Sequence, residues 1–220
     1  NPWKDGYVKL RIVYNGKTQD VSDTGDLAEP EANANVVFEI ENTSKDQTFA
    51  VVLRINGENT LFREKTHEPR DCKKWIVPPM TTRRIDGFQS DEKVAVPFKV
   101  LSPEESTELS YAPQAGTIHL ICFQGTVVTE DPYKEIVKKR DDKQREVVSI
   151  AKGTLKNSTE MPRSLEALKK KLLARADPDP LDRDARGYIG AGNSKLDNPV
   201  EWKFFKYQSD QPAQETVFHY

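Results

Sequence analysis

Two Asn-Gly dipeptides, each following an alternating segment, constrain the fold of this chain more than any other feature of its sequence. Apolar and polar residues alternate over residues 7–14, just before Asn15-Gly16, and over residues 47–55, just before Asn56-Gly57. Strict alternation is typical of a half-buried strand. Asn-Gly is the strongest short hairpin signal, because both central residues of a type I′ turn need positive φ. The sequence therefore predicts two antiparallel hairpins, the second of which turns at Asn56-Gly57.

Several other short segments also have the character of strands, namely residues 35–41, 75–77, 94–100 and 117–123. The last of these has apolar residues on both faces, which indicates a central strand that is covered on both sides. Pro97 cannot donate to a β-ladder, so it predicts either an edge strand or a bulge. Short strands separated by turn residues favour a mainly β fold, as an antiparallel β-sandwich or a barrel-like domain.

Helical patterns occur at two places in the chain. Ser102 and Glu105 have the spacing of a capping box, which predicts one short helical turn. Residues 126–198 are predicted to be an insertion of helix and loop, because leucines recur there at helical spacing: Leu165, Leu168, Leu172 and Leu173. Residues 199–220 contain two further strand-like segments, and an isolated two-stranded hairpin is only marginally stable. We therefore expect a single β-rich domain over residues 1–220, whose last strands return to the sheet after the insertion.

Charge and hydropathy exclude two classes of partner. The formal net charge of −2 provides no basic field that would hold nucleic acid. The sequence has no apolar run of about 18 residues, so we expect a soluble chain without membrane insertion. The two cysteines, Cys72 and Cys122, allow either one disulfide bridge or two buried free thiols. Because the chain begins with Asn1 rather than Met, we expect it to be part of a longer precursor.

The residues that could carry catalysis lack a recognisable nucleophilic arrangement. His119 and Cys122 are three residues apart in a predicted strand, so their side chains should point to opposite faces. His67 and Cys72 share a loop, where no second signature accompanies them. An acidic cluster after the predicted helix is interrupted by prolines and does not match a calcium loop: Asp177, Asp179, Asp182 and Asp184. We therefore expect no enzyme activity, no metal site and no cofactor.

Basic residues around an aromatic residue form the candidate ligand-binding site of the sequence. Lys73 precedes Trp75 by two residues, and Arg83 and Arg84 follow after a short turn. Cations interleaved with an aromatic ring can bind anions, sugars or acidic partners. The alternative interpretation places Trp75 in the core and leaves the charged residues at exposed loop ends.

The order and spacing of four segments carry a resemblance to known domains. Residues 49–61, 74–79, 85–89 and 97–101 resemble uncharacterised bacterial accessory β-sandwich domains. Such domains occur beside Ser/Thr kinases or caspase-like proteases, or in exported proteins. The resemblance covers about residues 35–125 and brings no catalytic residues with it. It implies a sensing, scaffolding or binding role, often outside the cytoplasm.

These observations lead to one expected function and two alternatives. We expect a non-catalytic binding or interaction module of an exported or envelope-associated bacterial protein, in a secreted or periplasmic location. A protein or a carbohydrate is its expected partner. One alternative is a hydrolase that uses a loop nucleophile such as Cys72. The other is a structural spacer domain.

Overall fold

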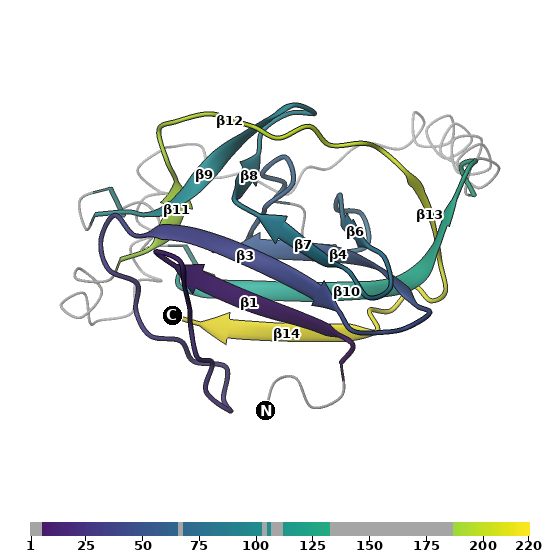
Figure 1. Cartoon of the computed structure of the whole chain (residues 1–220), viewed down its shortest axis with the longest axis horizontal. Helices are drawn as coiled ribbons and strands as arrows, with labels where there is room; N and C mark the ends of the chain where they lie inside the picture. The colour runs from purple at the N-terminus through teal and green to yellow at the C-terminus, as the bar shows by residue number, and fades with distance from the viewer. Residues whose placement is uncertain (1–5, 66–67, 103–104, 107–111, 133–186) are drawn as a thin grey trace, which may run out of the picture. The chain divides into compact units, whose positions relative to one another are not determined.

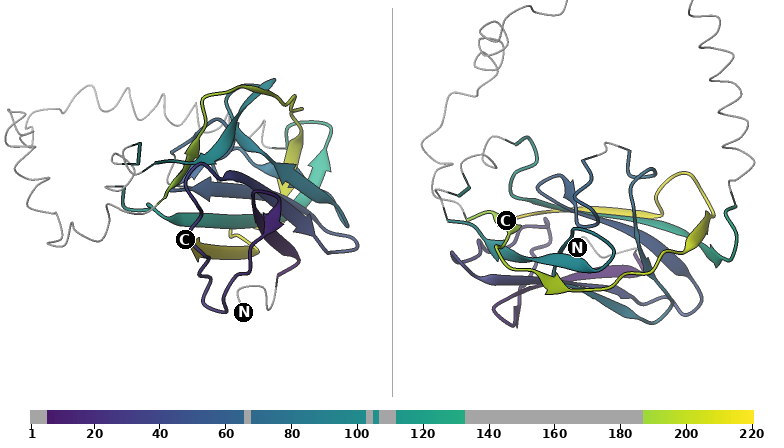
Figure 2. Two further views of the ribbon diagram at one scale, coloured as in Figure 1. Left: turned by 60° about the vertical axis from the view of Figure 1, so that its left-hand side comes forward. Right: turned by 90° about the horizontal axis from the view of Figure 1, so that it is seen from above.

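A computed structural model of the chain shows strands connected by turns and loops, with no helix in the part that it describes. That part comprises residues 6–65, 68–102, 105–106, 112–132 and 187–220. Its strands form two antiparallel sheets that face each other as the layers of a sandwich (Figures 1 and 2). The prediction of a mainly β, antiparallel, sandwich-like fold is therefore confirmed.

The chain divides into two compact units. One combines residues 1–130 with 183–220, and the other comprises residues 131–182. All strands of the described part belong to the first unit. The predicted insertion over residues 126–198 lies largely outside the described residues, and so do its leucine-rich helix and its acidic cluster. The described ends of that range contain strands, because β10 (Thr117–Val128) runs into it and two short strands precede its end.

The first sheet has eight strands, which are antiparallel throughout. Its main order is β11-β9-β3-β1-β2, with β7 paired to β3 and with β8 and β12 paired to β9. The strands are β1 (Val8–Tyr14), β2 (Lys17–Thr18), β3 (Asn35–Asn42), β7 (Thr82–Ile85), β8 (Gly87–Gln89), β9 (Val94–Val100), β11 (Ile189–Ala191) and β12 (Leu196–Asp197). β1 and β3 form its longest pair, from Val8 opposite Asn42 to Tyr14 opposite Val36.

The second sheet has six strands arranged around β10. Its main order is β13-β10-β4-β5, with β14 paired to β10 and β6 paired to β4. The remaining strands are β4 (Thr48–Ile55), β5 (Glu58–Asn59), β6 (Trp75–Val77), β13 (Phe204–Tyr207) and β14 (Gln214–His219). β13 and β14 both pair with β10, at its two halves, so the C-terminal strands join the sheet that the first half of the chain begins.

The core lies between the two sheets and contains the inward residues that alternation predicts. Apolar side chains from both layers are almost fully buried there, among them Val8, Leu10, Ile12, Phe38, Ile40, Phe98, Val51, Leu53, Ile55, Ile118, Leu120 and Phe218. Their transfer out of water is the main favourable contribution to folding. The opposite face of the second sheet also has a small apolar cluster, made by Val52, Cys72, Ile121 and Phe123. β10 is therefore covered on both faces, as its sequence predicts.

Both Asn-Gly dipeptides form the predicted tight turns. Asn15 and Gly16 have φ values of 48° and 79°, and Asn56 and Gly57 have values of 52° and 81°. The second turn joins β4 to β5, with Ile55 opposite Glu58. The predicted hairpin at Asn56-Gly57 is therefore confirmed, although β5 contains only two residues.

Pro97 lies in the middle of β9 rather than on an edge. β9 has neighbours on both sides, because Ala95 pairs with Gln89 of β8 and with Leu196 of β12. The edge-strand alternative is therefore wrong. Pro97 lies where β9 exchanges β8 for β3 as its neighbour, and an interruption of the ladder there accommodates a residue without an N–H group.

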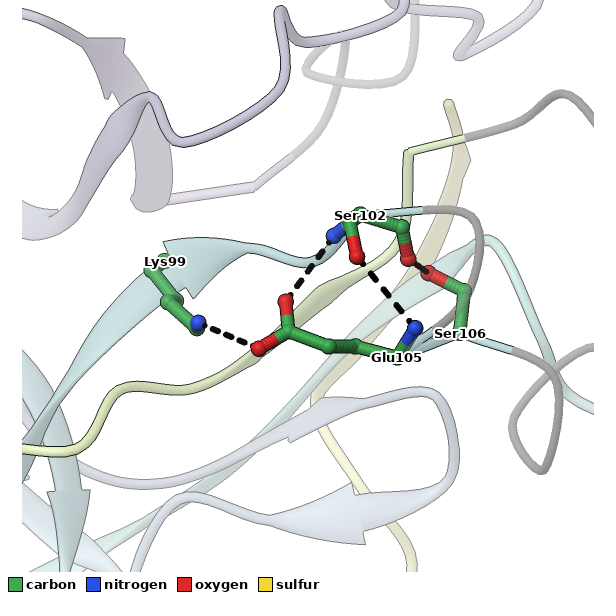
Figure 3. Close-up of polar contacts among 4 residues, drawn as sticks. All are labelled: Lys99, Ser102, Glu105 and Ser106. Atoms are coloured by element: carbon green, nitrogen blue, oxygen red, sulfur yellow. Dashed lines mark hydrogen bonds and ion pairs between the residues drawn. The ribbon is translucent and has the colours of Figure 1, made fainter.

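The short turn after β9 has the reciprocal hydrogen bonds of a capping box (Figure 3). The backbone N–H of Ser102 donates to Glu105 Oε2 over 3.1 Å, and the backbone N–H of Glu105 donates to Ser102 Oγ over 3.3 Å. The Ser106 N–H donates to the Ser102 carbonyl over 2.9 Å. Lys99 Nζ lies 2.8 Å from Glu105 Oε1 and adds an ion pair. The capping box that the sequence predicts is confirmed.

Candidate functional site

The four basic and aromatic residues that the sequence singles out occupy different environments. Trp75 is only 5 % exposed and lies in the core, where its Nε1–H donates to Thr60 Oγ1 over 2.9 Å. Arg83 lies above the Trp75 ring, with Cζ 5.5 Å from the ring centroid, and its Nε–H donates to a backbone carbonyl. Arg84 is exposed and forms an ion pair with Asp86, with Nε 2.7 Å from Oδ1. The fold thus brings Trp75 and Arg83 together and directs Arg84 to solvent.

Lys73 points to an aromatic surface that the sequence did not single out. Its Nζ lies 5.2 Å from the ring centroid of Trp202. Trp202 is 52 % exposed, and its ring stacks on Phe62 with centroids 5.4 Å apart and planes 10° from parallel. The indole N–H of Trp202 donates to Glu92 Oε1 over 2.7 Å. We call Phe62, Arg63, Lys73, Glu92 and Trp202 the Trp202 surface.

The backbone beneath this surface has an unusual conformation. Phe62 and Arg63 are consecutive residues with positive φ, of 55° and 53°. The left-handed region costs about 1–2 kcal/mol for a residue with a side chain, and bulky residues seldom adopt it. Surrounding contacts hold this geometry: the Phe62 N–H donates to the Gln89 carbonyl over 2.8 Å, and the Arg63 guanidinium lies 5.2 Å from the Phe88 ring centroid. Such strain, when the fold maintains it, concentrates at functional sites.

Hydrogen bonds join the segment before Trp202 to residues 89–92, at the end of β8 and in the loop after it. The carboxamides of Gln89 and Asn198 join the two segments, since Asn198 Nδ2 donates to Gln89 Oε1 over 2.8 Å and Gln89 Nε2 donates to the Asn198 carbonyl over 2.7 Å. The Val200 N–H donates to the Glu92 carbonyl over 2.8 Å. Gln89 is fully buried, so its carboxamide needs these partners. Trp202 is therefore held in place before any partner arrives.

Lys73 and Glu92 place charges of both signs against the exposed indole, and further charged contacts lie on the adjoining loops. Arg63 forms an ion pair with Glu58 over 2.9 Å, and the backbone N–H of Lys73 donates to Glu64 Oε2 over 2.7 Å. Glu92 is bound to the indole N–H itself. The surface thus combines a central aromatic stack with a rim of balanced charge.

The sequence analysis missed Phe62 and Trp202 because they are distant in the chain and meet only through the fold. Phe62 follows β5, and Trp202 lies between β12 and β13. Trp202 alternates with Glu201 and Lys203 in one of the strand-like segments, so no pattern in the sequence indicated that its ring would be exposed.

Cys72, the candidate nucleophile of the alternative function, lies on the outer face of the second sheet. It is 5 % exposed and packs with Val52 and Phe123. Its Sγ accepts a hydrogen bond from Arg54 Nη2 over 3.3 Å and can donate to the Glu68 carbonyl over 3.5 Å. Both cysteines are free thiols, so the two-thiol alternative holds and the disulfide bridge does not form.

Lys74 is half-buried beside Cys72 and carries a perturbed amine. Its Nζ donates to the carbonyls of Arg70 and Cys72, over 2.7 Å each, and lies 5.1 Å from the Phe123 ring centroid. Burial lowers the pKa of Lys74 to about 8, and the positive charge of Arg70 acts in the same direction. The negative form of Cys72 acts the opposite way. Lys74 and Arg54 thus place two cations next to one thiol.

His119 and Cys122 point to opposite faces of β10, as predicted. Cys122 is in the core between the sheets, where burial raises the pKa of its thiol. His119 is on the outer face, and its Nε2 lies 2.8 Å from Glu215 Oε1. The two residues therefore cannot act as a catalytic pair.

Two further features concern metals and membranes. Within the described residues, no group of three or more His, Cys, Asp and Glu side chains is placed to hold a metal ion. No helix in that part of the chain is long and apolar enough to span a membrane.

Comparisons with family models, with curated proteins and with solved structures give no match to this chain.

Proposed function

We propose that the chain is a non-catalytic binding module that recognises a protein partner through the Trp202 surface. The observation that carries this proposal is the half-exposed Trp202 ring, stacked on Phe62 and fixed by Glu92. We place the module in an exported or envelope-associated bacterial protein, secreted or periplasmic, as the resemblance over residues 35–125 implies.

The chemistry of the surface supports a protein partner. Tryptophan and arginine dominate the small sets of residues that carry most of the energy of protein interfaces. The aromatic centre with a rim of mixed charge, formed here by Arg63, Lys73 and Glu92, corresponds to the usual distribution of residues in such interfaces. A side chain that is already held in place loses little conformational entropy on binding. The strained backbone of Phe62 and Arg63 has a reason under this proposal, because it presents the ring on which Trp202 rests.

The environment of Cys72 supports binding over hydrolysis. A nucleophilic thiol must reach the substrate, but this thiol is 5 % exposed and is packed against an apolar cluster. Hydrolysis and a spacer role are the two alternatives, and the binding experiment described next separates them from a binding module.

The test uses the purified chain to capture partners from an envelope extract of the bacterium that encodes it. Binding of the captured protein is then measured with wild-type chain, with Trp202→Ala and with Tyr7→Ala. Tyr7 is 51 % exposed, so its replacement removes an equally exposed aromatic ring elsewhere on the surface. We expect Trp202→Ala to weaken binding at least about tenfold, as at other aromatic hot spots. Tyr7→Ala should leave the affinity unchanged.

Three outcomes contradict the proposal. They are undiminished binding by Trp202→Ala, an equal loss with Tyr7→Ala, and capture of no partner by the wild-type chain, which is the result that a spacer domain predicts. Cys72→Ser provides the comparison with the hydrolase alternative. The proposal expects this variant to bind the partner as the wild type does, whereas a hydrolase would lose its activity on a chromogenic ester panel.

A further inference from the structure

A groove opens on the second sheet where β13 and β14 separate along β10. β10 pairs with β14 as far as Cys122 and with β13 from Gly125 onward, so the chain that links β13 to β14 arches away between them (Figure 1). The groove has a volume of about 350 Å³ and is lined by Gln124, Gln208, Ser209, Gln211, Pro212 and Ala213.

Backbone hydrogen bonds fix the frame of this groove. The Gln208 N–H donates to the Gln124 carbonyl over 2.9 Å, and the Ala213 N–H donates to the Cys122 carbonyl over 2.8 Å. Between these two points, the ion pair of Arg70 with Asp210, 3.1 Å long, ties the arch to the loop before β6. The groove is therefore largely formed before a ligand enters.

The lining combines polar and apolar groups and includes no ionisable side chain. Within the described part of the chain, the carboxamides of Gln124, Gln208 and Gln211 form no hydrogen bond with protein groups. Each carboxamide offers two N–H donors and one carbonyl acceptor. Ser209 Oγ accepts a hydrogen bond from the Gln211 N–H over 3.1 Å, and its own hydroxyl proton remains available. The groove thus presents several donors and acceptors without protein partners on a backbone frame that hydrogen bonds hold.

We infer that this groove binds a neutral saccharide. Each hydroxyl group of a sugar ring can donate and accept a hydrogen bond. A carboxamide can pair with two neighbouring hydroxyl groups, because its N–H donates to one and its carbonyl oxygen accepts from the other. The volume falls within the range of about 300–1,000 Å³ that small-molecule sites have. The absence of a charged side chain from this lining disfavours phosphate, carboxylate or ammonium ligands.

An extended peptide fits this groove less well than a sugar does. Strand addition requires free backbone groups at a sheet edge. The carbonyls of Cys122 and Gln124, which a peptide would use here, already accept hydrogen bonds from the arch. The side chains, rather than the backbone, are what the groove offers.

This inference is independent of the proposed protein partner, because the groove and the Trp202 surface share no residue. The test is a titration of the ¹⁵N-labelled chain, followed by NMR, with glucose, galactose, mannose and N-acetylglucosamine and with their common disaccharides. We expect saturable shifts of the side-chain amide signals of Gln124, Gln208 and Gln211 with at least one sugar. An open groove with few contacts should give a dissociation constant in the millimolar range, so the titration extends to about 100 mM.

Variants separate this site from weak binding elsewhere. The double variant Gln208→Ala, Gln211→Ala should bind the sugar at least about tenfold more weakly. Gln19 follows β2 of the first sheet and is not part of the groove. Gln19→Ala therefore removes a carboxamide elsewhere and should leave the affinity unchanged, as should Trp202→Ala. The amide spectrum of each variant establishes that it is folded. The inference is overturned if no sugar shifts these signals, if the double variant binds as the wild type does, or if glucuronate or glucose 6-phosphate binds more tightly than neutral glucose.

Discussion

The two Asn-Gly turns of this protein have the same sequence and nearly the same backbone, yet they serve different purposes. Asn15 and Gly16 have φ values of 48° and 79°, and Asn56 and Gly57 have values of 52° and 81°. The first turn is exposed, and a Cβ added at Gly16 would meet nothing within 4 Å. Its asparagine exchanges hydrogen bonds with one neighbour, because Asn15 Oδ1 accepts from the Asn35 N–H over 2.9 Å.

The second turn is joined to three distant parts of the chain. Asn56 Oδ1 accepts hydrogen bonds from the Gly116 N–H and from the Tyr220 hydroxyl, over 2.9 Å each. Asn56 Nδ2 donates to the Ile189 carbonyl over 2.8 Å, and the Ile189 N–H donates to the Tyr220 hydroxyl over 3.0 Å. One carboxamide thus holds the start of β10, the strand β11 and the C-terminal residue.

The difference teaches that a local signal fixes the shape of a turn but not its contribution to stability. Both dipeptides form the turn because asparagine and glycine tolerate positive φ. Only at Asn56 does the side chain satisfy partners that would otherwise be buried without hydrogen bonds, and such groups are costly to leave unpaired.

The largest expected effect comes from replacing each asparagine by glycine. Glycine keeps the positive φ, and its effects on backbone strain and on the entropy of the unfolded chain are similar at the two positions, so the difference between the variants reports the contacts of the carboxamide. Asn56→Gly should lower the free energy of unfolding by about 2–4 kcal/mol, because several buried partners lose their hydrogen bonds. Asn15→Gly should lower it by at most about 0.5 kcal/mol, because its partner can bind water. Urea unfolding measures both values, and similar losses at the two sites would refute the comparison.

Tyr220→Phe tests one connection of the second turn. The variant keeps the ring, which is buried, and removes the hydroxyl that lies between Asn56 Oδ1 and the Ile189 N–H. We expect a loss of about 2 kcal/mol in the free energy of unfolding. In the Asn56→Gly background the same change should cost less, since the two groups share a hydrogen bond. Additive losses in a double-mutant cycle would show that the connection carries no energy.

Alkaline pH provides a third test, because the burial of two tyrosine hydroxyls determines whether stability rises or falls with pH. Burial raises the pKa of Tyr220, and likewise that of Tyr14, above the ordinary value. The unfolded chain therefore releases these protons first, so the contribution of the two tyrosines to stability is complete below about pH 10 and falls above it. Each buried tyrosine should contribute a slope of about 1.4 kcal/mol per pH unit.

The slope is best measured between about pH 10.5 and 12. The pKa of Lys74 is lowered from 10.5 to about 8, so this residue makes stability rise with pH between those two values. Its effect is therefore largely complete below the measuring window. Tyr220→Phe should remove about a third of the decline, because burial also raises the pKa values of Tyr14 and Cys122, whereas Asn15→Gly should leave the decline unchanged. An equal decline in Tyr220→Phe and the wild type, followed by circular dichroism in urea, would contradict the burial of the hydroxyl.

The smallest expected effect concerns the two glycines. Gly16→Ala and Gly57→Ala should each cost about 1 kcal/mol, because both force a side chain into the left-handed region. At Gly57 the new methyl group would also meet the side chain of Gln114, whose flexible end can move away. Thermal unfolding should therefore show similar shifts for the two variants. A loss at Gly57 several times that at Gly16 would mean that the turns differ in their backbones as well.

Much of the fold could be predicted because it depends on neighbouring residues. The alternation over residues 7–14 and 47–55 identifies strands and their inward faces, and the capping box at Ser102 has its expected hydrogen bonds. The apolar residues on both faces of residues 117–123 indicated a covered central strand, which β10 is. The same pattern could not say that Cys72 and its loop provide part of the cover.

The candidate site was less accessible to sequence reasoning, because its parts are distant along the chain. Lys73 belongs to it, but its ring partner is Trp202 rather than the neighbouring Trp75. In an extended strand, the direction of a side chain follows from its parity, but the identity of the facing segment depends on how sheets and loops pack. The groove between β13 and β14 likewise exists only because these two strands pair with different parts of β10.

The sequence by itself determined where the strands lie and where Asn15-Gly16 and Asn56-Gly57 turn the chain, because φ preferences and alternation act within a few residues. Only the tertiary structure decided that Asn56 would hold Tyr220, and that Phe62 would carry Trp202. These contacts join segments more than a hundred residues apart, and their formation depends on the whole pattern of strand pairing, which no local preference encodes.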